Sequence, residues 1–186
     1  MIMKNDLTTK FWIITSSIIA ISLTRFLPHP PNFTALGAMA LFGGAIYTDN
    51  WKRFLIPILA LFLSDLVLNN VFLSQWYEGF VWVTPGAGYL YGAMVATIAL
   101  GQFMIKELKT TNIALAAVIS SVLFFLVTNF GVWAGGAMYP KTGAGLIMAY
   151  EAGLPFLLNT LAGNILFSAV LFGGYAFAQN RATAAH

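Results

Sequence analysis

Long apolar runs separated by short polar clusters dominate this 186-residue chain. Six of the runs are close to the length that crosses the hydrocarbon core of a bilayer, roughly 17 to 25 residues of helix. The pattern predicts helices at about residues 11–27, 33–47, 54–68, 86–105, 112–133 and 154–179. We therefore expect an all-α integral membrane protein, in which residues 1–186 form a single domain of six transmembrane helices.

Polar and conformationally restrictive residues mark the boundaries of these helices. Pro28 ends the first one, because a proline inside a helix removes a hydrogen bond and clashes with the preceding turn. The pair Asn69 and Asn70 closes the third. The hydrophilic turn before the third helix holds Asp49, Asn50, Lys52 and Arg53. Residues 71–85, rich in aromatic side chains, and residues 134–153, rich in glycine, are predicted as irregular.

Composition then indicates that the protein is surrounded by a lipid bilayer rather than by water. Hydrophobic residues make up 59% of the chain and charged residues 8%, against about 25% charged residues in soluble proteins. So few charges cannot cover a water-exposed surface, which excludes a soluble enzyme and a disordered chain. Membrane lipid is the first expected partner. The nine basic residues are scattered rather than gathered in a stripe, so no nucleic-acid partner is expected.

The basic residues also predict the orientation. With six spans, both termini and the connections after the second and fourth helices lie on one side of the membrane. That side holds Lys4, Lys10, Lys52, Arg53, Lys106, Lys109 and Arg181. Arg25 and Lys141 fall on the other side. By the positive-inside rule both termini are cytoplasmic, and the longer, chemically richer connections face outward.

Polar side chains within the apolar runs gather toward the predicted outer ends. They are Asn32, Asp65, Asn69, Asn129 and Asn159. A polar or charged group in hydrocarbon costs up to a few kcal/mol, so these side chains should face one another, a cavity or a ligand. We predict them as substrate-binding residues. The alternative is a structural network, for instance an Arg25–Asp65 ion pair that clamps the first and third helices.

Aromatic residues are more abundant on the predicted outer side than on the inner side. Those assigned to the substrate site are Trp76, Tyr89, Trp133 and Tyr139. Trp and Tyr form belts at both faces of a membrane, and such a belt explains about half of the outer set. The excess indicates rings that line a pocket for a flat or apolar ligand.

His29 lies between two prolines in the first outer connection. It can donate, accept, titrate near neutrality or ligate a metal, although a lone loop histidine is commonly just solvated. The chain has no Cys to complete a metal site. The stretch GGAMYPKTG is not a P-loop, because Pro140 stands where the second glycine is needed. Without a recognisable nucleophile, we expect no enzymatic activity and no intrinsic cofactor.

Three stretches, in the order of the predicted topology, resemble a known family. HPPNFTALGAMALFGGA enters the second helix, FLSDL ends the third and TNFGVW ends the fifth. With six spans and both termini inside, the chain resembles the S components, which are the substrate-binding membrane subunits of energy-coupling factor (ECF) transporters. The resemblance covers most of residues 11–177. It is closest to a bacterial putative-transport family of this type, near the solitary vitamin B12 S components.

This resemblance implies a multi-pass subunit of the bacterial cytoplasmic (inner) membrane that takes up a vitamin or related micronutrient, with cobalamin or another corrinoid ranked first. The vitamin B12 members are expected to offer a cysteine to the cobalt, and this chain has none. Either His29 is the axial ligand, or the corrinoid binds without axial replacement, or the substrate is another vitamin or a metal ion.

The resemblance also implies a partner, an ECF module made of a transmembrane T component and two ATPases. S components present small residues at every fourth position of the first helix to the T component. Here Ser16, Ala20 and Thr24 match that spacing. A contrasting hypothesis is a non-transporting membrane scaffold subunit. A scaffold predicts a filled outer end, whereas a binding subunit predicts a cavity there.

Overall fold

A computed structural model describes residues 2–184 of the chain. Its α-helices are α1 (Ile2–Ser22), α2 (Leu36–Ile46), α3 (Asn50–Val67), α4 (Ala87–Met104), α5 (Thr110–Gly135) and α6 (Gly143–Ala184). Short helical turns join them: η1 (Leu23–Phe26) and η3 (Ser74–Trp76) are 3-10 turns, and η2 (Leu68–Phe72) is a π-helical turn. The described residues contain no strand, which confirms the all-α prediction.

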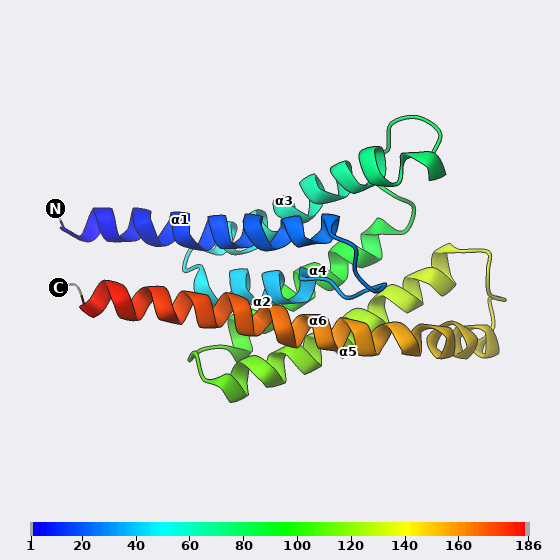
Figure 1. Cartoon of the computed structure of the whole chain (residues 1–186). Coiled ribbons are helices and arrows are strands. Elements are labelled where there is room, and N and C mark those ends of the chain that lie inside the picture. Colours follow the sequence, from blue (N-terminus) through cyan, green and yellow to red (C-terminus); the bar gives the residue numbers. More distant parts are fainter. Residues whose placement is uncertain (1, 185–186) are drawn as a thin grey trace.

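Successive helices run back and forth along the bundle (Figure 1). Both chain termini lie at one end, together with the short α2–α3 and α4–α5 connections. The opposite end carries three longer connections, residues 27–35, 73–86 and 136–142. We call these two ends the termini end and the loop end.

Helix α2 occupies the centre of the bundle and contacts all five other helices. Its Gly and Ala residues let the neighbouring helices pack directly against its main chain. Gly44 of α2 lies against the Ile98 carbonyl of α4, and Gly101 of α4 lies against the Leu41 carbonyl of α2. Neither glycine has room for a Cβ. With 11 residues, α2 is about 17 Å long and cannot alone cross a hydrocarbon core of about 30 Å.

In the part of the chain that the structure describes, four helical segments are long and apolar enough to cross a membrane. They are Asn50–Phe72, Ala87–Met104, Thr110–Gly135 and Gly143–Arg181. Each keeps a large apolar surface outside the bundle, for example at Leu63, Leu115 and Leu158. The chain is therefore a multi-pass membrane protein. The prediction of six full spans is not confirmed. Helix α2 is short, and α1 begins with a polar stretch that includes Lys4 and Lys10.

A hydrophobic core fills the half of the bundle toward the termini end. The ring of Phe42 on α2 packs edge-on against Phe172 and Tyr175 of α6, with centroids 5.2 and 5.7 Å apart. Such pairs stabilise a core beyond the area they bury. The buried hydroxyls of Thr15 and Tyr47, 2.6 Å apart, satisfy each other beside this core. The core also includes Ile14, Ile18, Met39, Leu61, Met94 and Ile98.

The prediction of an irregular stretch at residues 134–153 was wrong for most of its length. Helix α6 begins at Gly143 rather than at Leu154, and only residues 136–142 connect it to α5. The hydroxyl of Thr142 accepts a hydrogen bond from the Gly145 N–H. This side-chain cap offsets the poor helix propensity of the glycines in the first turn.

At three other places, the polar residues that were predicted to end a helix do not end it. Helix α3 begins at Asn50 rather than at residue 54, so the charged residues before the apolar run form its first turn. Asn69 and Asn70 do not close a helix, because the chain continues through them as the π-helical turn η2. Helix α1 begins at Ile2 rather than at residue 11. Charged side chains at a helix end reach water without breaking the backbone pattern.

Candidate binding site

Two adjoining cavities lie in the half of the bundle toward the loop end. The larger one, the outer chamber, has a volume of about 830 Å³, and the smaller one, the inner chamber, about 220 Å³. Asn32, Leu90 and Phe124 line both, so the chambers meet at these residues. Ser120 on the inner chamber is about 22 Å along α5 from the end of that helix at Gly135. The inner chamber is therefore the deeper of the two.

The outer chamber has aromatic, amide and glycine walls from α4, α5 and α6. Tyr89 of α4 packs flat against Gly131 of α5, where a Cβ would overlap the ring. The amide of Asn129 on α5 packs in the same way against Gly153 of α6. Its Nδ2 also donates to the main-chain carbonyl one turn earlier at 2.9 Å. The two glycines thus let the three helices approach around the chamber.

The inner chamber is polar at its deepest part. Ser120 and Ser121 of α5 and Asn164 of α6 line it, and all three are buried. The Asn164 Nδ2 atom lies 3.0 Å from the Ala117 carbonyl, 2.8 Å from Ser120 Oγ and 3.1 Å from Ser121 Oγ. Gly37 of α2 lies against the face of the same amide, since a Cβ there would be 2.8 Å from Cγ, Nδ2 and Oδ1 alike. The amide is held between three helices.

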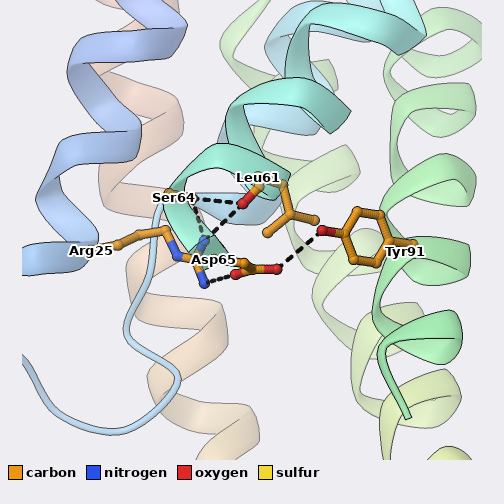
Figure 2. Close-up of polar contacts among 5 residues, drawn as sticks. All are labelled: Arg25, Leu61, Ser64, Asp65 and Tyr91. Atoms are coloured by element: carbon orange, nitrogen blue, oxygen red, sulfur yellow. Dashed lines mark hydrogen bonds and ion pairs between the residues drawn. The ribbon is translucent and has the colours of Figure 1, made fainter. Parts of the chain in front are cut away.

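Arg25 lines the inner chamber and is the centre of a cluster of polar contacts (Figure 2). Arg25 Nη2 pairs with Asp65 Oδ1 at 2.6 Å, and Nη1 donates to the Ser64 hydroxyl and, at 3.5 Å, to the Leu61 carbonyl. Tyr91 of α4 donates to the other Asp65 oxygen at 3.2 Å. The side chains of Arg25 and Asp65 are only 10% and 16% exposed. The pair ties η1 to α3 and neutralises Arg25, which is the one charged residue lining either chamber in the described chain.

The first long connection reaches the junction of the chambers. Asn32 has a φ of 62°, in the left-handed region that asparagine tolerates better than most residues. Asn159 of α6 donates its Nδ2 to the Pro31 carbonyl at 2.9 Å. This contact holds the connection against α6. Asn159 is therefore a positioning residue for Asn32 rather than part of a chamber wall.

The structure brings together some of the predicted substrate-binding residues and not others. Those lining the outer chamber are Asn32, Tyr89, Asn129 and Tyr139. Those outside the walls of both chambers are His29, Asp65, Asn69, Trp76, Trp133 and Asn159. Four of the ten predicted residues thus line a chamber, and the other six contact neighbouring residues or lie away from the walls.

The residues outside the walls have identifiable surroundings. Trp133 donates its Nε1 to the Pro140 carbonyl at 2.9 Å and so supports the last connection. Asn69 is buried within η2, whereas Trp76 is 75% exposed at the loop end. His29 is exposed, with Nδ1 2.9 Å from the Pro30 carbonyl. In the described part of the chain, no group of three or more His, Asp or Glu side chains could hold a metal ion.

The residues assigned to partner docking lie on α1 and η1. Ser16 and Ala20 are exposed, and Thr24 is half-buried. The Ser16 and Thr24 hydroxyls donate to main-chain carbonyls of α1, at 3.2 and 2.6 Å. Because these two hydroxyls are paired within the chain, this face carries small side chains without an unpaired hydroxyl.

Sequence reasoning missed the polar floor of the inner chamber, formed by Ser120, Ser121, Thr160 and Asn164. A signal was present, because each is a polar residue inside a long apolar run. Serine and threonine are common in membrane helices, however, since their hydroxyls bond back to the main chain. Which of them faces the bundle depends on the rotation of α5 and α6, and the apolar residues surround both helices too evenly to reveal it.

The sequence was compared with models of known protein families. A model described as a family of unknown function (DUF6580) matches residues 5–185. The chain belongs to the DUF6580 family. The matched region takes in both chambers and parts of all six α-helices of this DUF6580 protein. No curated protein and no solved structure matches the chain.

Proposed function

We propose that this protein is the substrate-binding subunit of a micronutrient transporter, of the S-component kind that its sequence resembles. The observation that carries the proposal is the pair of adjoining chambers at the loop end. Cavities of about 300–1,000 Å³ with largely apolar walls and a few placed polar groups are typical of small-molecule sites. The contrasting scaffold hypothesis requires a packed loop end, so the chambers favour the binding subunit.

The distribution of basic residues supports uptake from outside. The segments at the termini end contain Lys4, Lys10, Lys52, Arg53, Lys106, Lys109 and Arg181. The loop end has Arg25 and Lys141. Under the positive-inside rule the termini end is cytoplasmic. In a bacterial cytoplasmic membrane the chambers then open away from the cytoplasm.

A corrinoid such as cobalamin is the first ligand to test, followed by smaller vitamins. Tyr89 and Tyr139 give the outer chamber the aromatic surface that a flat ligand needs. A volume of about 830 Å³ suits a drug-sized molecule, so a whole corrinoid has to extend through the open mouth. The proposal does not depend on an axial bond from His29, because that ring lies outside both chambers.

The proposed partner is an ECF module, docked on α1. The exposed small residues Ser16 and Ala20, continued by Thr24, allow a helix of the T component to approach closely. The ATPases of the module supply the energy for transport in this scheme.

Ligand-dependent stabilisation of the purified protein tests the proposed function. The unfolding temperature of the full chain in detergent is measured with cobalamin, cobinamide and a panel of water-soluble vitamins. A ligand at one hundred times its Kd stabilises the folded state by about 2.7 kcal/mol. We expect one chemical class to raise the unfolding temperature saturably, and a corrinoid that co-purifies to show its visible absorbance. If no member of the panel stabilises the protein, the proposed function is wrong.

Two matched variants locate the binding. Ala152 and Ala162 are both exposed on α6, and of the two only Ala152 lines the outer chamber. Ala152→Trp fills the chamber without removing a side-chain hydrogen bond, so it should abolish ligand-dependent stabilisation. Ala162→Trp adds the same bulk elsewhere and should keep it. The same response in both variants would contradict binding in the outer chamber.

A further inference from the structure

The orientation of the Asn164 amide is set by its neighbours. The Ala117 carbonyl can only accept a hydrogen bond and lies 3.0 Å from Nδ2, so the amide nitrogen rather than the oxygen must face it. The hydroxyls of Ser120 and Ser121 already donate to the same carbonyl. Their oxygens therefore act as acceptors toward Nδ2, whose two hydrogens are shared among these two oxygens and the Ala117 carbonyl. Oδ1 is left as an acceptor that α5 does not use.

The Oδ1 atom of Asn164 is buried without a partner. Asn164 is 2% exposed and lines the inner chamber. Among the described residues Oδ1 has no hydrogen-bond partner. Native proteins rarely leave a buried acceptor unpaired, because it loses water without a replacement. Because Asn164 lines the inner chamber, a group bound there is the nearest source of a partner from outside the chain.

The other polar groups of the inner chamber favour the same ligand chemistry. Ser120, Ser121 and Thr160 each donate their hydroxyl hydrogen to a main-chain carbonyl. They therefore present lone pairs rather than hydrogens to the chamber. Arg25 brings a positive charge, but Asp65 neutralises it at 2.6 Å. At Ser120, Ser121, Thr160 and Asn164 the chamber wall thus offers acceptors, and the Arg25–Asp65 pair adds no net charge.

We propose that the inner chamber binds an uncharged hydrogen-bond donor of the ligand, a carboxamide or similar N–H group that donates to Asn164 Oδ1. The rest of the ligand extends past Asn32 into the outer chamber, beside Tyr89. This assignment rests on the proposed function, because it names the group by which that site selects its ligand. A carboxylate is disfavoured there, since it brings an unpaired charge and sets lone pairs against an acceptor.

Three small probes of nearly equal shape test this selectivity: benzamide, acetophenone and benzoate. Benzamide offers N–H donors, acetophenone has a methyl group in their place, and benzoate has a negatively charged oxygen. Titration of each into the full chain in detergent, followed by ligand-observed NMR, measures the Kd. We expect benzamide to bind about tenfold or more tightly than the other two. Equal binding of benzamide and acetophenone, or no benzamide binding up to its solubility limit, would overturn the inference.

A variant of the acceptor separates a binding role from a structural one. Asn164→Leu keeps the size of the side chain and leaves Ser120, Ser121 and Ala117 bonded to one another. If Oδ1 has no partner until a ligand binds, this variant should unfold at the same temperature as the wild type or at a higher one, because an unpaired buried acceptor has been removed. Its affinity for benzamide should fall to that for acetophenone. A large loss of stability together with an unchanged benzamide preference would assign Asn164 a purely structural role.

Ser168→Ala is the matched control. Ser168 lies one turn further along α6, is buried, and has an Oγ atom without a partner among the described residues, but it does not line either chamber. The preference for benzamide should survive in this variant. The vitamin panel keeps the two proposals distinct: a vitamin that binds wild type and Asn164→Leu equally well would refute the donor subsite alone, whereas a panel without any binder refutes the proposed function.

Discussion

At the termini end of the bundle, the rings of Phe42 and Phe172 interlock, and the main chains of α2 and α4 touch at Gly44 and Gly101. At the loop end, the same helices surround two chambers and bury an Asn164 oxygen that has no partner in the described chain. Close packing stabilises the folded state, whereas open space and unmet hydrogen bonds cost stability. The contrast indicates that one end of these helices holds the fold and the other end is kept available for a ligand.

Asp65→Asn is expected to have the largest effect on stability. It leaves the Arg25 guanidinium without a counter-charge in a site where the two side chains are 10% and 16% exposed, which costs about 3–5 kcal/mol. The free energy of unfolding in detergent is the measurement. The double variant Arg25→Met/Asp65→Leu removes both charges and should recover most of the loss. A double variant as unstable as the single one would show that the ion pair is not the cause.

Gly101→Ala probes the packed end. The new Cβ meets the Leu41 main chain of α2, and such overpacking costs about 1–3 kcal/mol. The affinity of the remaining folded protein for its ligand should not change, because Gly101 lines neither chamber. Gly173→Ala is the control, since the space around that position is open and alanine favours a helix by about 1 kcal/mol. A loss of affinity in Gly101→Ala would break the separation between the two ends.

Asn70→Ala should loosen the loop end locally. The Asn70 Oδ1 atom accepts from the Val81 N–H at 2.7 Å, and Nδ2 donates to the Val81 carbonyl at 2.9 Å. Losing this pair is expected to cost about 1–2 kcal/mol and to speed amide hydrogen exchange in residues 74–86, while exchange in α2 stays the same. Asn112→Ala, which removes a half-buried asparagine at the termini end, should leave both regions unchanged. Faster exchange in α2 would mean that the two ends open together.

Lys52→Ala should have the smallest effect. Lys52 pairs with Asp49 at the termini end, and the two side chains are 27% and 49% exposed. Because solvent and salt screen such a pair, the loss in unfolding free energy should stay below about 0.5 kcal/mol and shrink further as salt is added. Unfolding curves at low and high salt measure it. A loss above about 1 kcal/mol would show that surface charge, and not packing alone, holds this end.

Some features could be predicted from local patterns, and others could not. The ends of α4 and α5 were expected within two residues, because glycine and charged turns interrupt a strong apolar run there. The start of α6 was not expected at Gly143. The Thr142 side chain caps the glycine-rich first turn through a hydrogen bond, and composition does not reveal such a bond. For the site, the structure places Asn32 and Asn129 on a chamber wall, whereas Asp65 pairs with Arg25. The deeper Asn164 was missed because helix rotation, which composition leaves open, decides which polar residue faces inward.

By itself, the sequence determined that the protein lies in a membrane, that it is helical, and that its polar side chains concentrate toward one end. These properties follow from how often apolar residues occur and from where polar residues interrupt the apolar runs. Only the tertiary structure decided which of those side chains surround a cavity. That outcome depends on contacts between residues far apart in the chain, such as Gly37 against Asn164 and Asn159 against Pro31. A cavity is the space left between packed helices, and so it is a property of their arrangement and not of any one helix.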